Sequence, residues 1–199
     1  FFGNGTRAQA AFTRALELQP DAPRALLGLA RQHFITGDAT TGTALFTRCR
    51  GILTDKSAPL LTRAREQRAT RKFKTALYTL ERAAAINPAD KEIYLEIDSL
   101  CRETGDRKTS LKHLERYRYL DPTDAEILVR IANLFLTGGM YRQRWLEIDT
   151  GLNTVRRAIV LTPDNAELYA LEAAFLKLKG DADGAAHAEK KFRDRAGDE

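Results

Sequence analysis

Residues 101–122 read CRETGDRKTSLKHLERYRYLDP, and the punctuation of this stretch decides the fold. Gly105 can take the left-handed conformation that ends one helix, and the side chain of Asp106 can cap the first amide groups of the next. Pro122 lacks an N–H and stops that second helix from running on. Pro122 follows Gly105 by 17 positions, which leaves room for a helix of about four turns. The stretch therefore predicts the turn and the second helix of a helical hairpin.

The same punctuation recurs along the chain at a fixed interval. Glycines at this position are separated by 34, 68, 34 and 41 residues: Gly3, Gly37, Gly105, Gly139 and Gly180. Prolines that follow an apolar–polar pair are separated by 68, 34 and 41 residues: Pro20, Pro88, Pro122 and Pro163. Arg71 stands where one glycine is missing, and Thr54 stands where one proline is missing. Two independent markers thus predict tandem units of 34 residues, one of which has an insertion of 7.

A third pattern concerns the crossing points of the helices. Five positions after each glycine position, with allowance for the insertion, the residues are all small: Ala8, Gly42, Ala76, Ser110, Gly151 and Ala185. Two antiparallel helices approach closely only where a small residue stands between them. The pattern therefore predicts that each second helix packs against the first helix of its own unit.

These turns, small crossing residues and terminal prolines resemble the tetratricopeptide repeat, a unit of two antiparallel helices. The resemblance covers residues 1–199 as a single domain: a second helix alone (1–22), then units 23–56, 57–90, 91–124, 125–165 and 166–199. It implies an all-α, right-handed superhelical solenoid of antiparallel helix pairs with about five and a half repeats. Arg63 departs from the family, which has a large apolar residue there, so we expect its helix to pack loosely or to bury an ion pair.

The resemblance also implies a concave inner surface, formed mainly by the first helix of each unit. Along this surface, aliphatic residues predominate at one position of the unit, and arginines stand at two others in the first three units. We predict a groove that binds a peptide with aliphatic and acidic side chains, through Arg24, Leu27, Arg31, Leu61, Arg65, Arg68, Leu95, Ser99, Arg102, Val129, Asn133 and Leu136. Alternatively, these arginines are solvated surface without a binding role. Chaperone-binding members of the family use a clamp for a terminal carboxylate. Leu27, Leu61 and Leu95 stand at a position of that clamp and argue against it here.

Positive charge is concentrated in the first part of the chain. The sequence has 32 Lys and Arg against 27 Asp and Glu, a net charge of +5, and its densest basic run is Arg63, Arg65, Arg68, Arg71, Lys72 and Lys74. Such a run suits RNA, an acidic membrane or an acidic protein. Binding to nucleic acid also calls for aromatic side chains that stack on bases, and only Phe73 and Tyr78 are near the run. This shortage argues against nucleic acid as the partner.

The insertion in the fourth unit is open to two interpretations. From Gly139 to Pro163 there are 24 positions, where 17 are expected, and apolar residues recur at helical spacing through the segment. The added residues can extend the second helix and expose an assembly contact made of Tyr141, Trp145 and Ile148. They can also form a loop that folds back on its own unit, which Asp149, Thr150 and Gly151 favour.

The sequence lacks the patterns that catalysis requires. His33, His113 and His187 lie in different units, and Cys49 and Cys101 fall on core positions too far apart for a disulfide. We find no phosphate-binding loop, nucleophile motif or set of metal ligands, and no apolar run long enough to span a membrane. We therefore predict no catalytic residue, no metal and no cofactor, and two cysteines that act as small buried hydrophobes.

Together these patterns predict a non-catalytic scaffold that binds a partner protein or peptide in its concave groove. One alternative is a structural subunit of an oligomer, filament or larger complex. Such a subunit would assemble through the Trp145 region and through residues 1–22, which form a second helix without its first. Another is an accessory region of a larger enzyme. None of the patterns identifies the partner or the compartment.

Overall fold

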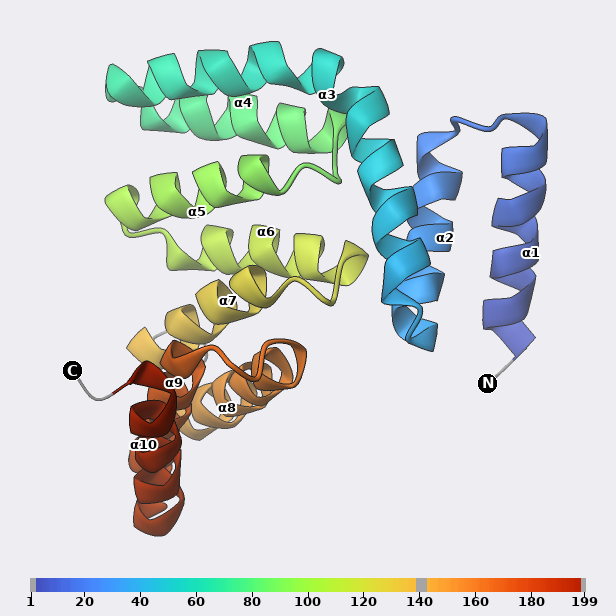
Figure 1. Cartoon of the computed structure of the whole chain (residues 1–199). Coiled ribbons are helices and arrows are strands. Elements are labelled where there is room, and N and C mark those ends of the chain that lie inside the picture. The colour runs from blue at the N-terminus through green and yellow to red at the C-terminus, as the bar shows by residue number, and fades with distance from the viewer. Residues whose placement is uncertain (1–2, 139–142, 198–199) are drawn as a thin grey trace. The chain divides into compact units, whose positions relative to one another are not determined.

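The computed structural model describes residues 3–138 and 143–197, with side chains from residue 7 onward. Over these residues the chain forms ten helices and no strand, which confirms the all-α prediction (Figure 1). The helices are α1 (Gly3–Leu18), α2 (Pro23–Thr36), α3 (Ala39–Ala69), α4 (Phe73–Ile86), α5 (Lys91–Thr104), α6 (Arg107–Leu120), α7 (Ala125–Thr137), α8 (Arg144–Leu161), α9 (Ala166–Lys179) and α10 (Ala182–Ala196). Residues 1–122 form one compact unit and residues 123–199 form a second.

The predicted turns end and begin helices as expected. Gly37, Gly105 and Gly180 take the left-handed conformation at helix ends, with φ of 87°, 74° and 84°. The aspartate after each glycine accepts a hydrogen bond from a backbone N–H in the first turn of the next helix: Asp38 from Thr41, Asp106 from Thr109 and Asp181 from Gly184. The punctuation read from the sequence is therefore confirmed at these three turns.

One turn keeps its geometry without its glycine. Arg71 has φ of 58°, the only positive φ among the non-glycine residues that the structure describes. Its backbone N–H still donates to the Arg68 carbonyl at 2.9 Å. The backbone N–H of Lys72 donates to the Gln67 carbonyl at 2.8 Å. Lys72 occupies the N-cap position of α4 and makes no side-chain cap. The turn thus forms with an unfavourable residue at both of its key positions.

The third helix is longer than the repeat predicts. α3 has 31 residues, and the boundary predicted between residues 56 and 57 falls inside it. Thr54, which replaces the proline, supplies the backbone N–H that lets the helix continue. Its Oγ1 donates to the Arg50 carbonyl at 2.8 Å, and the Ser57 Oγ donates to the Thr54 carbonyl at 3.2 Å. Pro59 follows within the helix, and Figure 1 shows that α3 changes direction about midway.

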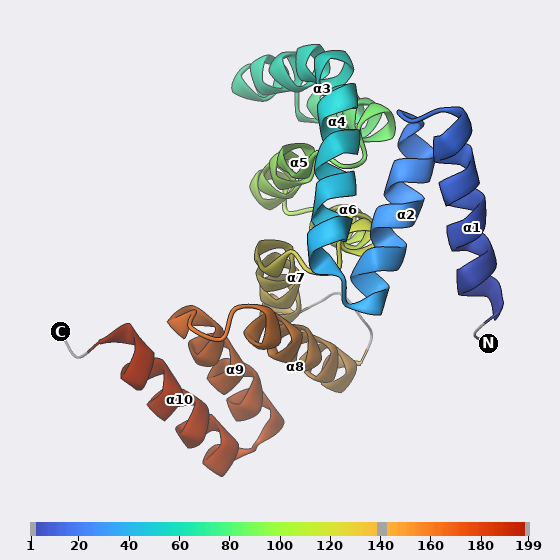
Figure 2. The same cartoon turned by 45° about the vertical axis from the view of Figure 1, so that its right-hand side comes forward.

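This bend places the first part of the chain beside the ends of later helices (Figures 1 and 2). We call residues 3–53 the N-terminal arm. Its Phe46 ring lies edge-on to Tyr117 of α6, with 5.8 Å between ring centroids. The Asn87 side-chain amide, between α4 and α5, donates to the Arg50 carbonyl at 3.2 Å. The arm therefore packs against α6 and the α4–α5 connection.

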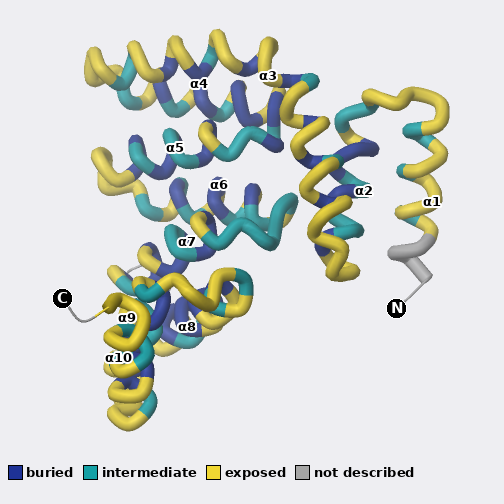
Figure 3. Tube along the Cα trace, in the orientation of Figure 1, coloured by how far each residue is buried: buried dark blue, intermediate teal, exposed yellow. Residues whose placement is uncertain are grey.

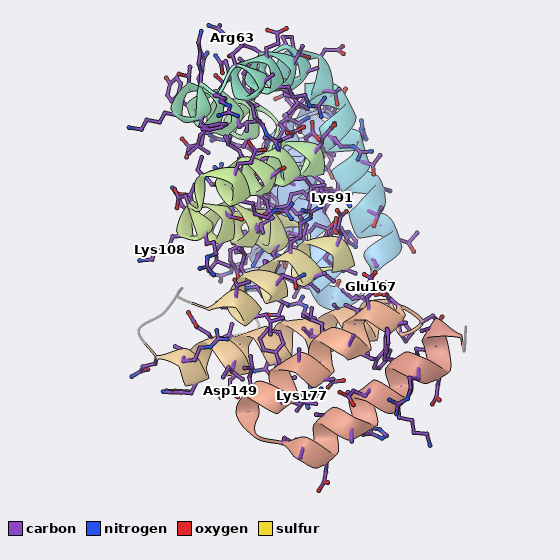
Figure 4. All side chains as sticks on the ribbon, turned by 90° about the vertical axis from the view of Figure 1, so that its left-hand side faces the viewer. Arg63, Lys91, Lys108, Asp149, Glu167 and Lys177 are labelled. Atoms are coloured by element: carbon purple, nitrogen blue, oxygen red, sulfur yellow. The ribbon has the colours of Figure 1, made fainter. Side chains whose placement is uncertain are left out.

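The position of the arm explains Arg63. The hairpin of α3 and α4 has no helix of the arm stacked on its outer side, and Arg63 on that side is exposed and points outward (Figure 4). The buried ion pair that we considered for Arg63 is therefore not formed. An arginine is compatible with this position because the side chain remains in solvent.

The small crossing residues lie where they were predicted. Gly42, Ala76, Ser110, Gly151 and Ala185 are buried, whereas Ala8 on α1 is partly exposed. A Cβ atom added to Gly151 would lie 2.3 Å from ring atoms of Phe175 and 3.1 Å from the Cβ of Phe135. Figure 3 shows that burial follows the facing sides of the hairpins, while α1 has no buried side chain among its described residues.

In the second unit, a core of Leu128, Ala158 and Leu168 joins α7, α8 and α9. α8 begins at Arg144, so residues 144–150 extend the helix and do not form a loop. Arg144 stabilises the beginning of α8. Its guanidinium donates to the carbonyls of Phe135 at 2.7 Å and Leu136 at 2.8 Å, and it pairs with Glu147 at 2.9 Å. Tyr141 of the predicted assembly contact lies outside the described residues.

Candidate functional site

Three of the binding residues predicted in the repeats 57–90 and 91–124 meet on one surface between α3 and α5. Arg65 and Arg68 lie three residues apart on one side of α3, and Ser99 lies on the facing side of α5 with Glu92, Glu96 and Glu103. We call these six residues the α3–α5 face. Helical periodicity produces it, since residues three or four apart share one side of a helix.

Ion pairs join the two helices across this face. The Arg65 Nε donates to Glu96 at 2.7 Å, and another Arg65 nitrogen pairs with Glu92. The Arg68 guanidinium donates to Glu103 from its Nε at 2.9 Å, to Glu96 at 3.0 Å and to the Ser99 hydroxyl at 2.8 Å. Each arginine therefore bridges at least two carboxylates and is held in a fixed orientation.

These contacts set the charges of the face. The hydrogen bond to Glu96 is the main cause that raises the pKa of Arg65, and that to Glu103 is the main cause for Arg68. The same bond to Arg68 lowers the pKa of Glu103. Arg65, Arg68 and Glu103 thus stay charged over the physiological range, and the attraction between them is weakened by solvent because they are partly exposed. A shallow depression of about 370 Å³ lies here, lined by Arg65, Arg68, Ala69, Glu96 and Glu103.

The other predicted binding residues within residues 1–122 are placed differently. Leu27 and Leu61 are buried in the packing, whereas Leu95 is partly exposed and Arg24 is exposed. Arg102 pairs with the buried carboxylate of Asp98 at 3.2 Å. The Arg31 guanidinium lies 3.9 Å from the centroid of the Tyr119 ring, and its Nε donates to the Tyr119 carbonyl at 3.1 Å. Arg31 therefore joins the arm to α6.

Of the predicted residues within 123–199, those that the structure describes lie on α7 and α8. Val129 packs against the core of that unit, Leu136 is partly buried and Asn133 is exposed. In the assembly contact, Ile148 is buried, while Trp145 is 60% exposed. Leu146 beside it is 38% exposed. An exposed aromatic side chain therefore stands at the first turn of α8.

The carboxylates of the α3–α5 face were missed at the sequence level. Glu92 and Glu96 look like a solvated helix surface in isolation. A signal was present, because Glu92, Glu96 and Glu103 lie 27 to 35 positions after the arginines, about one unit further along. In a repeat protein this separation brings side chains of adjacent first helices together.

Two cysteines and a histidine lie buried outside this face. Cys49 and Cys101 are free and buried, as predicted, and burial raises the pKa of their thiols to about 11 and about 12. His113 is buried next to Glu81, and burial lowers its pKa. Within residues 3–138 and 143–197, no cluster of three or more His, Cys, Asp or Glu could hold a metal ion. None of the helices described there is both long and apolar enough to cross a membrane.

Comparison with known proteins supports the fold. No family model and no curated protein matches the sequence. Solved structures are similar over most of the chain. The structure of YrrB, described as a TPR protein with an unusual peptide-binding site, is 16% identical, with a TM-score of 0.56, and the match covers 94% of this chain and 93% of that one. A structure of MamA is 14% identical, with a TM-score of 0.58, and the match covers 89% and 93%.

A third similar structure is pilF of Pseudomonas aeruginosa, which is 15% identical, with a TM-score of 0.51 and coverage of 95% of this chain and 83% of that one. Identities this low carry the architecture alone. Together with the turns and crossing residues described above, they show that the chain has the fold of the tetratricopeptide repeat proteins, a solenoid of helical hairpins.

Proposed function

We propose that this chain is a non-catalytic scaffold that binds a partner protein or peptide on the α3–α5 face. One observation carries the proposal: two arginines are held in fixed orientations beside an open depression, with the partly exposed Leu95 on the same helix as Glu92 and Glu96. Support of a weaker kind comes from YrrB, a protein of similar fold that is described as having a peptide-binding site. The sequence also predicted Val129, Asn133 and Leu136, within residues 123–199, as binding residues.

The mechanism of binding is exchange of carboxylates. A carboxylate of the partner replaces a glutamate on Arg65 or Arg68, and a guanidinium offers it two parallel hydrogen bonds. Each exposed ion pair contributes only about 0.2 to 1 kcal/mol, so several acidic residues and an apolar contact must act together. The arginines are already ordered by Glu92, Glu96 and Glu103, which reduces the entropy lost when a ligand binds.

A fluorescent peptide that alternates Glu and Leu tests this proposal. We expect Arg65→Glu with Arg68→Glu to weaken its binding by about tenfold or more, measured by fluorescence anisotropy. Arg157→Glu with Lys190→Glu is the matched control, because it changes the net charge equally at exposed residues of the second unit. Equal loss in both variants, or no binding by the unmodified chain, would contradict the proposal.

The second candidate function is assembly of copies or complexes through the start of α8. It is favoured by the exposed Trp145 and Leu146, since exposed apolar side chains of this size often mark contacts. Light scattering over a range of protein concentration tests it: Trp145→Ala should lower the average mass. A chain that stays monomeric at high concentration would exclude self-assembly. The acidic peptide should bind to Trp145→Ala as it does to the unmodified chain.

A further inference from the structure

The helices α4 and α6, each the second helix of its repeat, carry matching rows of exposed side chains, and five of the six residues are cationic. On α4, Lys74, Tyr78 and Arg82 recur at every fourth position, and all three are exposed. On α6, Lys108, Lys112 and Arg116 stand 34 positions further along and are also exposed. Figure 4 shows the Lys108 side chain pointing away from the helices. We call these six residues the α4–α6 stripe.

The two rows belong to one surface. The Glu81 carboxylate of α4 accepts a hydrogen bond from the Nε2 atom of His113 on α6 at 3.1 Å, so the two helices lie next to each other at this point. His113 is buried, whereas the stripe residues that flank it along α6 are exposed. Because residues four apart share one side of a helix, each row follows one side of its own helix, and all six side chains are exposed.

The cations of this stripe are not paired with carboxylates of the residues that the structure describes. Glu81 is occupied by His113, and Glu115 of α6 accepts a hydrogen bond from Arg118 at 2.7 Å. Asp106 caps the first turn of α6. Within the described part of the chain, none of the five cations in the stripe has an ion pair. The α3–α5 face differs in this respect, because carboxylates surround its arginines.

At the first two positions of each row, cations occur on α4 and α6 but not on α3 or α8. The residues at those two positions are Thr40 and Ala44 on α3, and Asp149 and Asn153 on α8, whereas the third position is an arginine there as well, Arg48 and Arg157. Asp149 pairs with Lys179 at 2.8 Å. A periodicity of the fold alone would not restrict the cations in this way, since the fold repeats along the whole chain.

We propose that the α4–α6 stripe docks this protein on an anionic lipid bilayer. Clustered Lys and Arg side chains on a helical surface adsorb to acidic lipid headgroups, and Tyr78 suits the membrane interface. Single-stranded nucleic acid requires a groove with aromatic side chains that stack on successive bases, but this surface is the outward side of two packed helices with one tyrosine. A bilayer requires no groove. The inference does not depend on the peptide proposal, since the two surfaces share no residue.

Vesicle sedimentation tests this inference. We expect the protein to bind vesicles of phosphatidylcholine with about one third phosphatidylglycerol, and not vesicles of phosphatidylcholine alone. Raised salt should release it. Each cation near an anionic bilayer strengthens adsorption about fivefold, so Lys108→Glu, Lys112→Glu and Arg116→Glu together should lower the partition coefficient by about 100-fold or more.

Two controls keep the test specific. Arg157→Glu, Lys190→Glu and Arg193→Glu change the net charge equally at exposed positions of the second unit and should reduce binding much less. Lys108→Gln, Lys112→Gln and Arg116→Gln give a milder version of the stripe variant, and circular dichroism checks that each variant is folded. Three results would overturn the inference: no binding of the folded chain to the anionic vesicles, equal losses in the two charge-reversed variants, or tighter binding to a single-stranded oligonucleotide than to the vesicles at the same ionic strength.

Discussion

At the scale of single residues, Arg71 shows what a substituted turn costs. Its φ of 58° is a left-handed conformation that costs a non-glycine residue about 1 to 2 kcal/mol. We expect Arg71→Gly to raise the free energy of unfolding by about 1 kcal/mol. Adding Lys72→Asp, which restores the missing cap of α4, should contribute about a further 1 kcal/mol. Urea denaturation followed by circular dichroism measures both changes.

A glycine placed nearby within a helix provides the control for this prediction. Arg63→Gly removes the same kind of exposed side chain from the interior of α3. It should lower stability by up to about 1 kcal/mol, because glycine disfavours helix. If both substitutions shift stability in the same direction, the turn is not the source of the effect.

His113 makes stability depend on pH. Burial lowers its pKa in the folded chain, so below about pH 6.5 the unfolded chain binds a proton more readily than the folded chain. The contribution of neutral His113 is therefore complete above that pH and is lost as pH falls through the range down to its folded pKa. We expect His113→Leu to lessen the loss of stability between pH 7 and pH 5, measured by denaturation at each pH. An identical pH dependence in the variant and the unmodified chain would refute this.

At the scale of helices, replacing glycine by alanine should have opposite effects at a crossing point and away from one. Gly151→Ala would bring a methyl group within 2.3 Å of the Phe175 ring and should destabilise the second unit by about 1 to 3 kcal/mol. Gly51→Ala, in α3, meets nothing within 4 Å and should stabilise by about 0.5 to 1 kcal/mol. Denaturation followed by Trp145 fluorescence and circular dichroism compares them. A stabilising Gly151→Ala would mean that the helices can separate at no cost.

The continuity of α3 leads to a further prediction at this scale. Thr54→Pro removes the backbone N–H that bonds within the helix and should destabilise the first unit by about 3 kcal/mol or more. Because the arm is joined to the later helices through α3, hydrogen exchange should accelerate mainly in residues 3–53. Asp55→Ala, at the next exposed position, should leave exchange nearly unchanged. Uniform acceleration over the whole chain would contradict a local role for Thr54.

The helices themselves were predictable from the sequence because their signals are local. Gly37, Gly105 and Gly180 act through backbone geometry, and the following aspartates act on amides three residues away. The course of α3 was not predictable in the same way. The replaced proline was visible at Thr54, but whether a helix then ends depends on contacts made elsewhere, such as the hydrogen bond from Asn87 to the Arg50 carbonyl.

At the scale of the whole molecule, we expect the two proposed surfaces, which differ in chemistry, to act independently. Variants of the α3–α5 face should keep their affinity for anionic vesicles, and variants of the α4–α6 stripe should keep their affinity for the acidic peptide. The effects of combined variants should be additive, since the surfaces share no side chain. Measuring both ligands on both sets of variants checks this, and a loss of both activities in either set would show that the surfaces are coupled.

The residues of the proposed α3–α5 face could be brought together from the sequence only in part. The periodic stripe placed Arg65, Arg68 and Ser99 on one surface because it depends only on helical spacing. It did not predict the burial of Leu27 or the contact of Arg31 with Tyr119, because both lie in the arm. A stripe drawn from a regular repeat assumes that every unit stacks in the same way, and the uninterrupted α3 changes that arrangement for the first unit.

The unbroken α3 has a mechanical consequence. Phe46, in contact with Tyr117, and Arg68, in contact with Glu103, lie on the same helix, which bends about midway without ending. In a string of separate hairpins a loop would absorb a small displacement before it travelled further. We therefore expect a ligand that displaces Arg68 to shift the backbone that carries Phe46, and near-ultraviolet circular dichroism of Tyr117 measures whether it does.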